Sequence, residues 1–166
     1  GGQNIAIGTA ALYSNTTAAN NTAVGSNALL SNTTGASNVA IGTHALRLNT
    51  TGCRNTAIGM ESMYSNTSGE NNIAMGQSAL EVNTTGDFNV ALGVKALDAN
   101  TTAPNNTAVG FCSLTANTTG TGNVGIGRYA LRQNTTAGGN TAVGINALLT
   151  NTTGSALVGI GGNAMY

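Results

Sequence analysis

The chain has 166 residues, only 6% of them charged, and its five basic and five acidic residues give a formal net charge of zero. Nucleic-acid surfaces need clustered Lys and Arg, and no apolar run approaches the roughly 18 residues of a membrane span. We therefore expect neither a nucleic-acid partner nor membrane insertion.

The sequence repeats every 17 residues without an insertion or deletion. Taking the Asn of each unit as position 1, the consensus is N-[ITV]-A-[IVLM]-G-x-x-[AS]-[LM]-x-x-N-T-[TS]-[GA]-x-x. Residues 1–166 are thus one repeat array, with nine full units and a truncated tenth that begins at Leu157. The opening "GGQNIAIG" and the closing "GGNAMY" indicate a part of a longer fibre. The units begin at Asn4, Asn21, Asn38, Asn55, Asn72, Asn89, Asn106, Asn123 and Asn140.

Positions 1–5 of each unit predict a short β-strand. In "NVAIG", Val39 and Ile41 alternate with Ala40, so the two large side chains share one face of the strand and Ala the other. We expect the large side chains to point inward. Position 4 would then form a buried column of Ile7, Val24, Ile41, Ile58, Met75, Leu92, Val109, Ile126 and Val143.

Positions 8–11 predict a second apolar segment, as in "ALRL" from Ala45. Its residue at position 9 should point inward opposite the first strand. A single helical turn is the alternative, although isolated short helices are weak. The second predicted column consists of Leu12, Leu29, Leu46, Met63, Leu80, Leu97, Leu114, Leu131 and Leu148.

Positions 12–15, usually "NTTG", predict a turn, because Asn, Thr and Gly tolerate or stabilise turn conformations. The sequence contains no Asn-Gly or Asp-Gly dipeptide, the strongest hairpin signals. The strands should therefore pair with their own copies in the next unit. The predicted fold is all-β: a parallel β-solenoid, or β-roll, of about ten 17-residue coils. With strands about 4.8 Å apart, such a rod would be on the order of 45–50 Å long.

The charged and aromatic residues all fall at positions 6, 7, 10, 16 and 17, which we predict to be the surface. The charged residues are Arg47, Arg54, Glu61, Glu70, Glu81, Asp87, Lys95, Asp98, Arg128 and Arg132. The aromatic residues are Tyr13, Tyr64, Phe88, Phe111, Tyr129 and Tyr166.

Position 3 is Ala in eight of the nine full units and Gly125 in the other. If this position faces outward, its small residues indicate close packing against another chain. The interior of a single coil also looks thin for a self-sufficient monomer. Both points predict self-association, as a homotrimer around a common axis.

The "NVAIGxxAL" core resembles the head repeats of trimeric autotransporter adhesins, the YadA-like parallel β-rolls. The longer unit with "NTTG" is similar to repeat arrays of phage tail fibres and bacterial surface proteins. The resemblance covers Asn4 to Gly161 and implies a three-chain fibre outside the cell. The unit is three residues longer than the adhesin repeat, so the turns need not match.

Nothing in the sequence predicts catalysis, a cofactor or a metal site. His44 has no nucleophile or acid assigned to it, and Cys53 and Cys112 lie four coils apart, roughly 19 Å, beyond the reach of a disulfide. Two Cys and one His are too few for zinc, and turns without carboxylates do not favour calcium.

The Asn of each "NTT" or "NTS" fits the N-x-[ST] acceptor for N-glycosylation, although the repeat period alone explains the motif. Stacked Asn side chains could instead form hydrogen-bonded ladders. The acceptor candidates are Asn15, Asn32, Asn49, Asn66, Asn83, Asn100, Asn117, Asn134 and Asn151.

The sequence thus predicts a structural and adhesive fibre segment, extracellular, on a cell surface or on a virion, with a cell-surface glycan or receptor as a further partner. The alternative function is ice binding through the Thr columns at positions 13 and 14.

Overall fold

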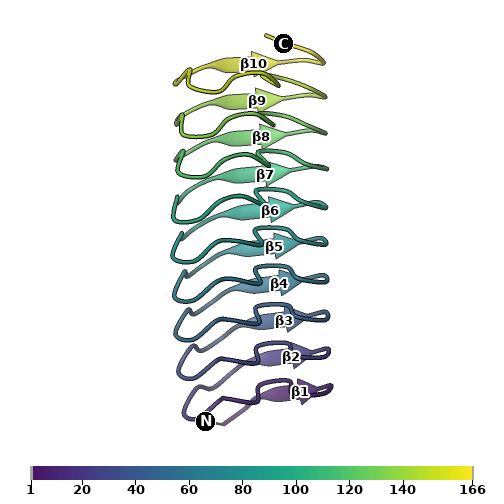
Figure 1. The fold of residues 1–166 in the computed structure, drawn as a ribbon, viewed down its shortest axis with the longest axis vertical. Helices are drawn as coiled ribbons and strands as arrows, with labels where there is room; N and C mark the ends of the chain where they lie inside the picture. Colours follow the sequence, from purple (N-terminus) through teal and green to yellow (C-terminus); the bar gives the residue numbers. More distant parts are fainter. Residues whose placement is uncertain (1, 166) are drawn as a thin grey trace.

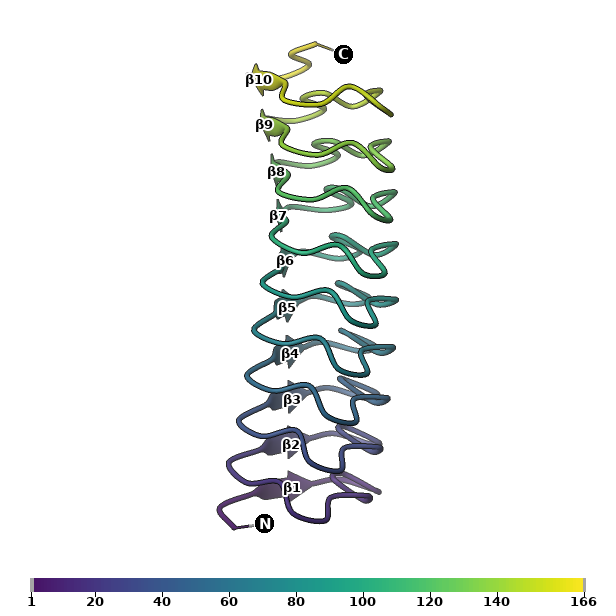
Figure 2. The same cartoon turned by 90° about the vertical axis from the view of Figure 1, so that its left-hand side faces the viewer.

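The computed structural model describes residues 2–165 and shows a rod of stacked coils (Figure 1). Each coil contributes one three-residue strand. The strands lie on the same side of the rod, and their column twists gradually along the axis (Figure 2). The strands are β1 (Ile5–Ile7), β2 (Thr22–Val24), β3 (Val39–Ile41), β4 (Thr56–Ile58), β5 (Ile73–Met75), β6 (Val90–Leu92), β7 (Thr107–Val109), β8 (Val124–Ile126), β9 (Thr141–Val143) and β10 (Val158–Ile160).

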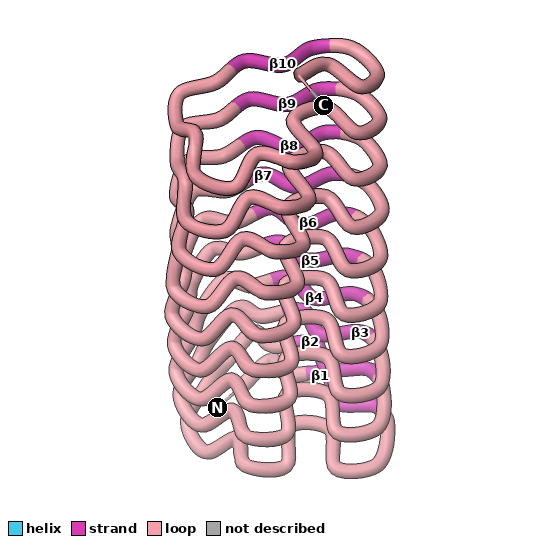
Figure 3. Tube along the Cα trace, turned by 45° about the horizontal axis from the view of Figure 1, so that its top comes forward, coloured by secondary structure: helices cyan, strands magenta, loops and turns pink. Residues whose placement is uncertain are grey.

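The ten strands form one parallel sheet in sequence order. Each residue pairs with the residue 17 positions later, as in Ala40 with Ala57. The rest of each coil is loop and turn (Figure 3), and no helix occurs in residues 2–165. The predicted all-β parallel solenoid with a 17-residue coil is therefore confirmed.

Hydrogen bonds join neighbouring coils on both sides of the rod. On the sheet side, the backbone N–H of Val39 donates to the carbonyl of Asn55 at 2.8 Å. On the opposite side, Leu46 N–H donates to the backbone carbonyl of Ser62 in the next coil at 3.0 Å. His44 N–H donates to the backbone carbonyl of Ser26 in the preceding coil at 2.9 Å. These bonds run along the axis, so each coil is held mainly by the coils above and below it.

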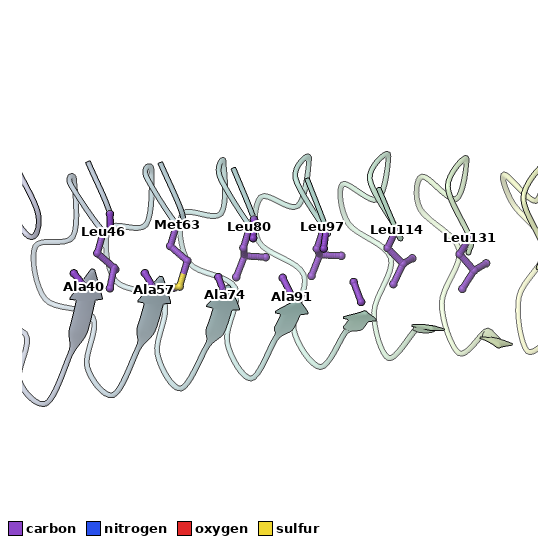
Figure 4. Close-up of a cluster of buried hydrophobic side chains, with 14 of the residues drawn as sticks. Ala40, Leu46, Ala57, Met63, Ala74, Leu80, Ala91, Leu97, Leu114 and Leu131 are labelled. Carbon is purple, nitrogen blue, oxygen red and sulfur yellow. The ribbon is translucent and has the colours of Figure 1, made fainter. Parts of the chain in front are cut away.

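The second segment is neither a strand nor a helical turn. Positions 7 and 9 adopt the left-handed conformation, with φ of 62° at His44 and 51° at Leu46. Residues with a side chain rarely do so, because Cβ crowds the neighbouring carbonyl. The burial of Leu at position 9 offsets this strain. The bent backbone brings Leu46 across the coil toward the strand of Ala40 (Figure 4).

The predicted column at position 9 is confirmed: Leu29 to Leu131 are fully buried along the rod, Leu148 is nearly so, and Leu12 in the first coil is the most exposed. The predicted phase of the strand is wrong. The Ala residues at position 3 are the buried ones, with 0% exposure in the inner coils, whereas Ile41 and Met75 at position 4 are 38% and 40% exposed.

The width of the coil explains this inversion. A Cβ built on Gly125 at position 3 would lie 2.7 Å from Ser113 Oγ and 3.3 Å from the Cγ of Leu114. Only a methyl group or a hydrogen atom fits between the strand and the facing segment. Val or Ile at positions 2 and 4 must therefore point outward.

Glycine at position 5 closes the corner after each strand. Gly59 has φ of 129°, a conformation open to Gly alone, and a Cβ there would lie 2.7 Å from the carbonyl of Gly76 in the next coil. The constant Gly therefore reflects both the corner and the close stacking of coils.

Two ladders of Asn side chains fill much of the remaining interior. At position 1, Asn38 N–H donates to Asn21 Oδ1 at 2.9 Å, and Asn38 Nδ2 donates to the carbonyl of Gly52 at 2.8 Å. At position 12, Asn49 Nδ2 donates to Asn32 Oδ1 at 2.9 Å and to Gly52 at 3.0 Å. Among the buried side-chain polar atoms of residues 2–165, only Arg47 Nε lacks a partner.

The rod encloses its own interior well. Its accessible surface is 6615 Å², below the roughly 7,500 Å² typical of a folded monomer of this mass. The interior holds one large apolar side chain per coil, at position 9, and the backbone and the amide ladders fill the remaining space. A partner chain would therefore contact the outer surface of the rod.

Candidate functional site

The largest candidate site is the outer side of the sheet, which we call the sheet face. It consists of the side chains at positions 2 and 4 of every strand. Ile73 and Met75 are 39% and 40% exposed in the middle of the rod. Position 2 holds Ile5, Thr22, Val39, Thr56, Ile73, Val90, Thr107, Val124, Thr141 and Val158, and position 4 holds Ile7, Val24, Ile41, Ile58, Met75, Leu92, Val109, Ile126, Val143 and Ile160.

The sheet face carries no charge along its whole length. All ten charged residues lie at other positions of the coil, as predicted, and none of them is buried. Two ion pairs link neighbouring charges, Arg54 with Glu70 and Lys95 with Asp98 at 3.8 Å, and His44 Nδ1 lies 3.8 Å from Glu61 Oε1. An apolar strip across ten coils is larger than the scattered exposed apolar residues of ordinary surfaces, and such strips mark interaction sites.

Four threonines interrupt the apolar column at position 2: Thr22, Thr56, Thr107 and Thr141. No two neighbouring coils both carry Thr there. In the described part of the chain, the Oγ1 atoms of these threonines make no hydrogen bond, so each hydroxyl faces outward with its bonding capacity unused by the chain itself.

Three of the aromatic residues, Tyr64, Phe111 and Tyr129, lie in two clusters away from the sheet face. Tyr64 contacts His44 edge-to-face, with 6.0 Å between the ring centroids, and the Cζ of Arg47 lies 5.5 Å from the centroid of the Tyr64 ring. Further along the rod, Tyr129 contacts Phe111 at 5.5 Å between ring centroids.

Arg128 and Arg132 both lie over the Tyr129 ring, at 4.5 and 4.8 Å from its centroid. Neither of these arginines has a carboxylate partner among the described residues. Tyr166, the last predicted surface aromatic, lies outside the described residues.

The residues considered for chemistry lie apart. Cys53 and Cys112 are free thiols, and burial raises the pKa of Cys112 above its usual value, which disfavours the reactive thiolate. In residues 2–165 no three His, Cys, Asp or Glu side chains are grouped so as to hold a metal ion. The same part of the chain contains no pocket.

The glycosylation candidates form the position 12 ladder. Asn32 to Asn134 are fully buried, while Asn15 and Asn151 at the ends are partly exposed. A glycan would attach to Nδ2, the atom that donates two hydrogen bonds in Asn49, Asn66 and Asn83. Glycosylation of these residues and closure of the ladder are therefore mutually exclusive.

The threonines at position 13 are also engaged within the rod. Thr50 Oγ1 donates to the carbonyl of Thr67 at 3.0 Å, and Thr84 Oγ1 donates to that of Thr101 at 3.1 Å. Position 14 is exposed. The hydroxyls on a regular strand surface are thus those of position 2, which the sequence pattern did not single out.

In comparisons with known proteins, no family model, no curated protein and no solved structure matches the chain. Within residues 2–165 there is no helix of a length and apolarity suited to crossing a bilayer. The chain is defined by its architecture: a rod-like solenoid of repeated β-coils.

Proposed function

We propose that the chain is a stiff segment of an extracellular fibre, on a bacterial surface or a virion, that holds a binding tip away from its particle. The observation that carries this proposal is the unbroken repetition of one coil, with strand pairing at the same 17-residue offset from β1 to β10. Each added repeat lengthens the rod by about 4.8 Å without changing its section. The proposal assigns no reaction and no cofactor to this segment.

A distance measurement across the rod tests its stiffness. Spin labels on Thr34→Cys and Thr119→Cys, in a background with Cys53→Ser and Cys112→Ser, would be five coils apart, about 24 Å along the axis. Both threonines are exposed. A stiff rod gives one narrow distance distribution. A broad one would contradict the mechanical function.

We also propose that the fibre contains several copies of the chain side by side, as a homotrimer. The sheet face supports this, since it is uncharged over the whole rod and, apart from four threonines at position 2, apolar. Mechanics adds a second reason: in a single rod the hydrogen bonds between each two coils would carry the whole axial load, whereas neighbouring copies would share it. Light scattering should give a mass three times that of the 16.3 kDa chain. A stable monomer would contradict the trimer.

The cluster around Tyr129 supports an added adhesive role toward a cell-surface glycan. Aromatic rings can stack on sugar faces, and the two arginines without carboxylate partners suit an acidic group. Titration of the chain with acidic and neutral oligosaccharides tests this role, and Arg128→Ala with Arg132→Ala should abolish any preference for the acidic ones.

Ice binding is the second candidate, and the sheet face favours it more than positions 13 and 14 do. The face presents methyl and hydroxyl groups at regular spacing on a parallel sheet. Only four of its ten residues at position 2 are Thr, however. A thermal-hysteresis assay separates the two functions, since a fibre segment should show none.

A further inference from the structure

We propose that the sheet face binds further copies of this chain in parallel orientation, and that the threonines at position 2 fix the axial register between the copies. The inference rests on the proposed fibre, in which all copies hold the tip at the same end and therefore run parallel, and it adds which surface is used and how the copies are aligned.

The spacing of the face favours a copy of the same chain as its occupant. Side chains project from the sheet once per coil in both columns, at the pitch of a parallel sheet. A partner can follow that spacing over ten coils only if its own projections repeat at the same pitch. A second copy meets this condition automatically, and an uncharged face suits an uncharged partner.

The area of the face fits a cooperative contact. The sheet face is a strip on the order of 45–50 Å long and about 10 Å wide. When two such strips meet, the two copies together bury roughly 1,000 Å² of surface. That value lies near the lower limit for a specific interface. Association should therefore strengthen with each added repeat.

Apolar contact alone would not set the register, because a rod with one repeated coil can slide by whole coils. The threonines remove this freedom. A Thr hydroxyl buried against Val or Ile loses its water without gaining a hydrogen bond, whereas two Thr in the same layer can bond to each other. Thr and Val have nearly the same shape, so the hydroxyl dominates the difference.

The order of residues at position 2 penalises each short slip. Because no two neighbouring coils both carry Thr, a slip by one coil places every Thr against an aliphatic residue. If Thr and aliphatic residues alternated strictly, a slip by two coils would again place every Thr against a Thr. The alternation is broken in the middle of the rod, where Ile73 and Val90 are consecutive aliphatic residues. After a slip by two coils, Thr56 would therefore face Val90, and Thr107 would face Ile73.

Two variants test the surface. Met75→Lys places a charge in the middle of the sheet face, where the side chain is already 40% exposed, and should leave the chain folded but monomeric. Phe88→Lys is the matched control, because Phe88 is 58% exposed at position 17, away from the sheet. Circular dichroism checks folding and light scattering gives the mass. A monomeric wild-type chain, or equal masses for both variants, would overturn the inference. A monomeric rod would still leave the stiff segment itself intact.

Cysteine cross-linking tests the register. In the chain with Cys53→Ser and Cys112→Ser, Val39→Cys should form disulfides with itself, since parallel copies in register bring the same layer together. Its mixture with Thr56→Cys reports a slip of one coil. Its mixture with Val124→Cys reports an antiparallel pair, because β3 and β8 are equally far from the middle of the rod. The same-layer product should exceed the product of the one-coil slip by at least about ten-fold, given the number of hydroxyls that the slip leaves unpaired. An antiparallel pair leaves none unpaired, because Thr22 then faces Thr141 and Thr56 faces Thr107, so the Val124→Cys mixture tests the direction of the copies separately from the threonines.

Replacing the threonines tests their role. With Thr22, Thr56, Thr107 and Thr141 all changed to Val, the copies should still associate, but the preference for the same layer over the adjacent layer should fall to about three-fold or less. This mixture uses Val39→Cys with a Cys at position 56. An unchanged preference would overturn the register role, and a dominant antiparallel product in the wild type would overturn the parallel alignment.

Discussion

Two apolar columns run the length of the rod and differ in what they tolerate. Position 9, inside the coil, is Leu in eight of the nine full units and Met63 in the other. Position 4, on the sheet face, varies among Ile, Val, Leu and Met. An interior side chain is enclosed by its own copies above and below and by the strand opposite, so its shape is restricted on every side. An outer side chain is restricted on one side only.

Position 3 shows the same contrast in small residues. Ala74 has no exposed surface, whereas its neighbour Met75 in the same strand is 40% exposed. A constant small residue between two variable large ones therefore marks the inside of a narrow coil, where space is limiting, and the variable residues mark the outside.

The largest effect should come from a charge at position 3. Ala74→Glu would place a carboxylate in an interior that has room for one methyl group, with no partner for the charge. We expect loss of more than about 5 kcal/mol of unfolding free energy and an unfolded chain by circular dichroism. Met75→Glu, one residue away on the sheet face, should remain folded. A folded Ala74→Glu chain would show that position 3 faces outward after all.

A cavity in the interior column should have the next largest effect. Leu80→Ala removes a fully buried side chain, and such changes cost about 2–5 kcal/mol. The matched outer change, Met75→Ala, should cost less than about 1 kcal/mol in the single chain, because that side chain is only partly buried. Urea denaturation of both variants, at concentrations where the copies do not associate, measures the difference. Equal losses of unfolding free energy in the two variants would show that position 4 is as enclosed as position 9.

Much of this architecture could be predicted from the sequence. The 17-residue period, the parallel pairing, the buried Leu at position 9 and the exposed charges all follow from residues that recur in fixed register. The turn at "NTTG" follows from the local preferences of Asn, Thr and Gly.

The phase of the strand could not be predicted from alternation, because alternation is symmetric: it says which residues share a face and not which face is inside. Hydrophobicity favoured Val and Ile for the interior. The width of the coil decided otherwise, and it depends on positive φ angles at His44 and Leu46 that sequence propensities do not predict. The constancy of Ala at position 3 was the available signal, and the Asn at position 1, on the same side of the strand, was a second one.

Interrupting an amide ladder should lower the free energy of unfolding by an intermediate amount. In Asn83→Ala, Asn66 Oδ1 loses its donor, and Asn100 Nδ2 loses one of its two acceptors. Buried polar groups without partners cost about 1–3 kcal/mol each, so we expect a loss of about 2–4 kcal/mol in urea denaturation. Thr85→Ala, at an exposed position of the same turn, should be nearly neutral. Similar stability of the two variants would mean that water replaces the ladder.

The smallest effect concerns pH and a charged residue outside both columns. Burial raises the pKa of Asp98 above its usual value, although Lys95 acts in the opposite direction. The folded chain therefore holds this proton more tightly than the unfolded chain does, so the contribution of Asp98 to stability is full below its unfolded pKa and is lost as the pH rises through its folded pKa.

In Asp98→Asn that titration is absent. The stability of the wild type relative to the variant should therefore increase as the pH falls from 7 to about 4, by less than about 1 kcal/mol because water still reaches the carboxylate. Urea denaturation at several pH values measures the difference. Lys95→Met removes the cation that lowers the pKa and should steepen the trend, since the carboxylate then loses its favourable neighbour. A wild-type chain that loses stability relative to Asp98→Asn on acidification would show that Lys95 outweighs burial at this site.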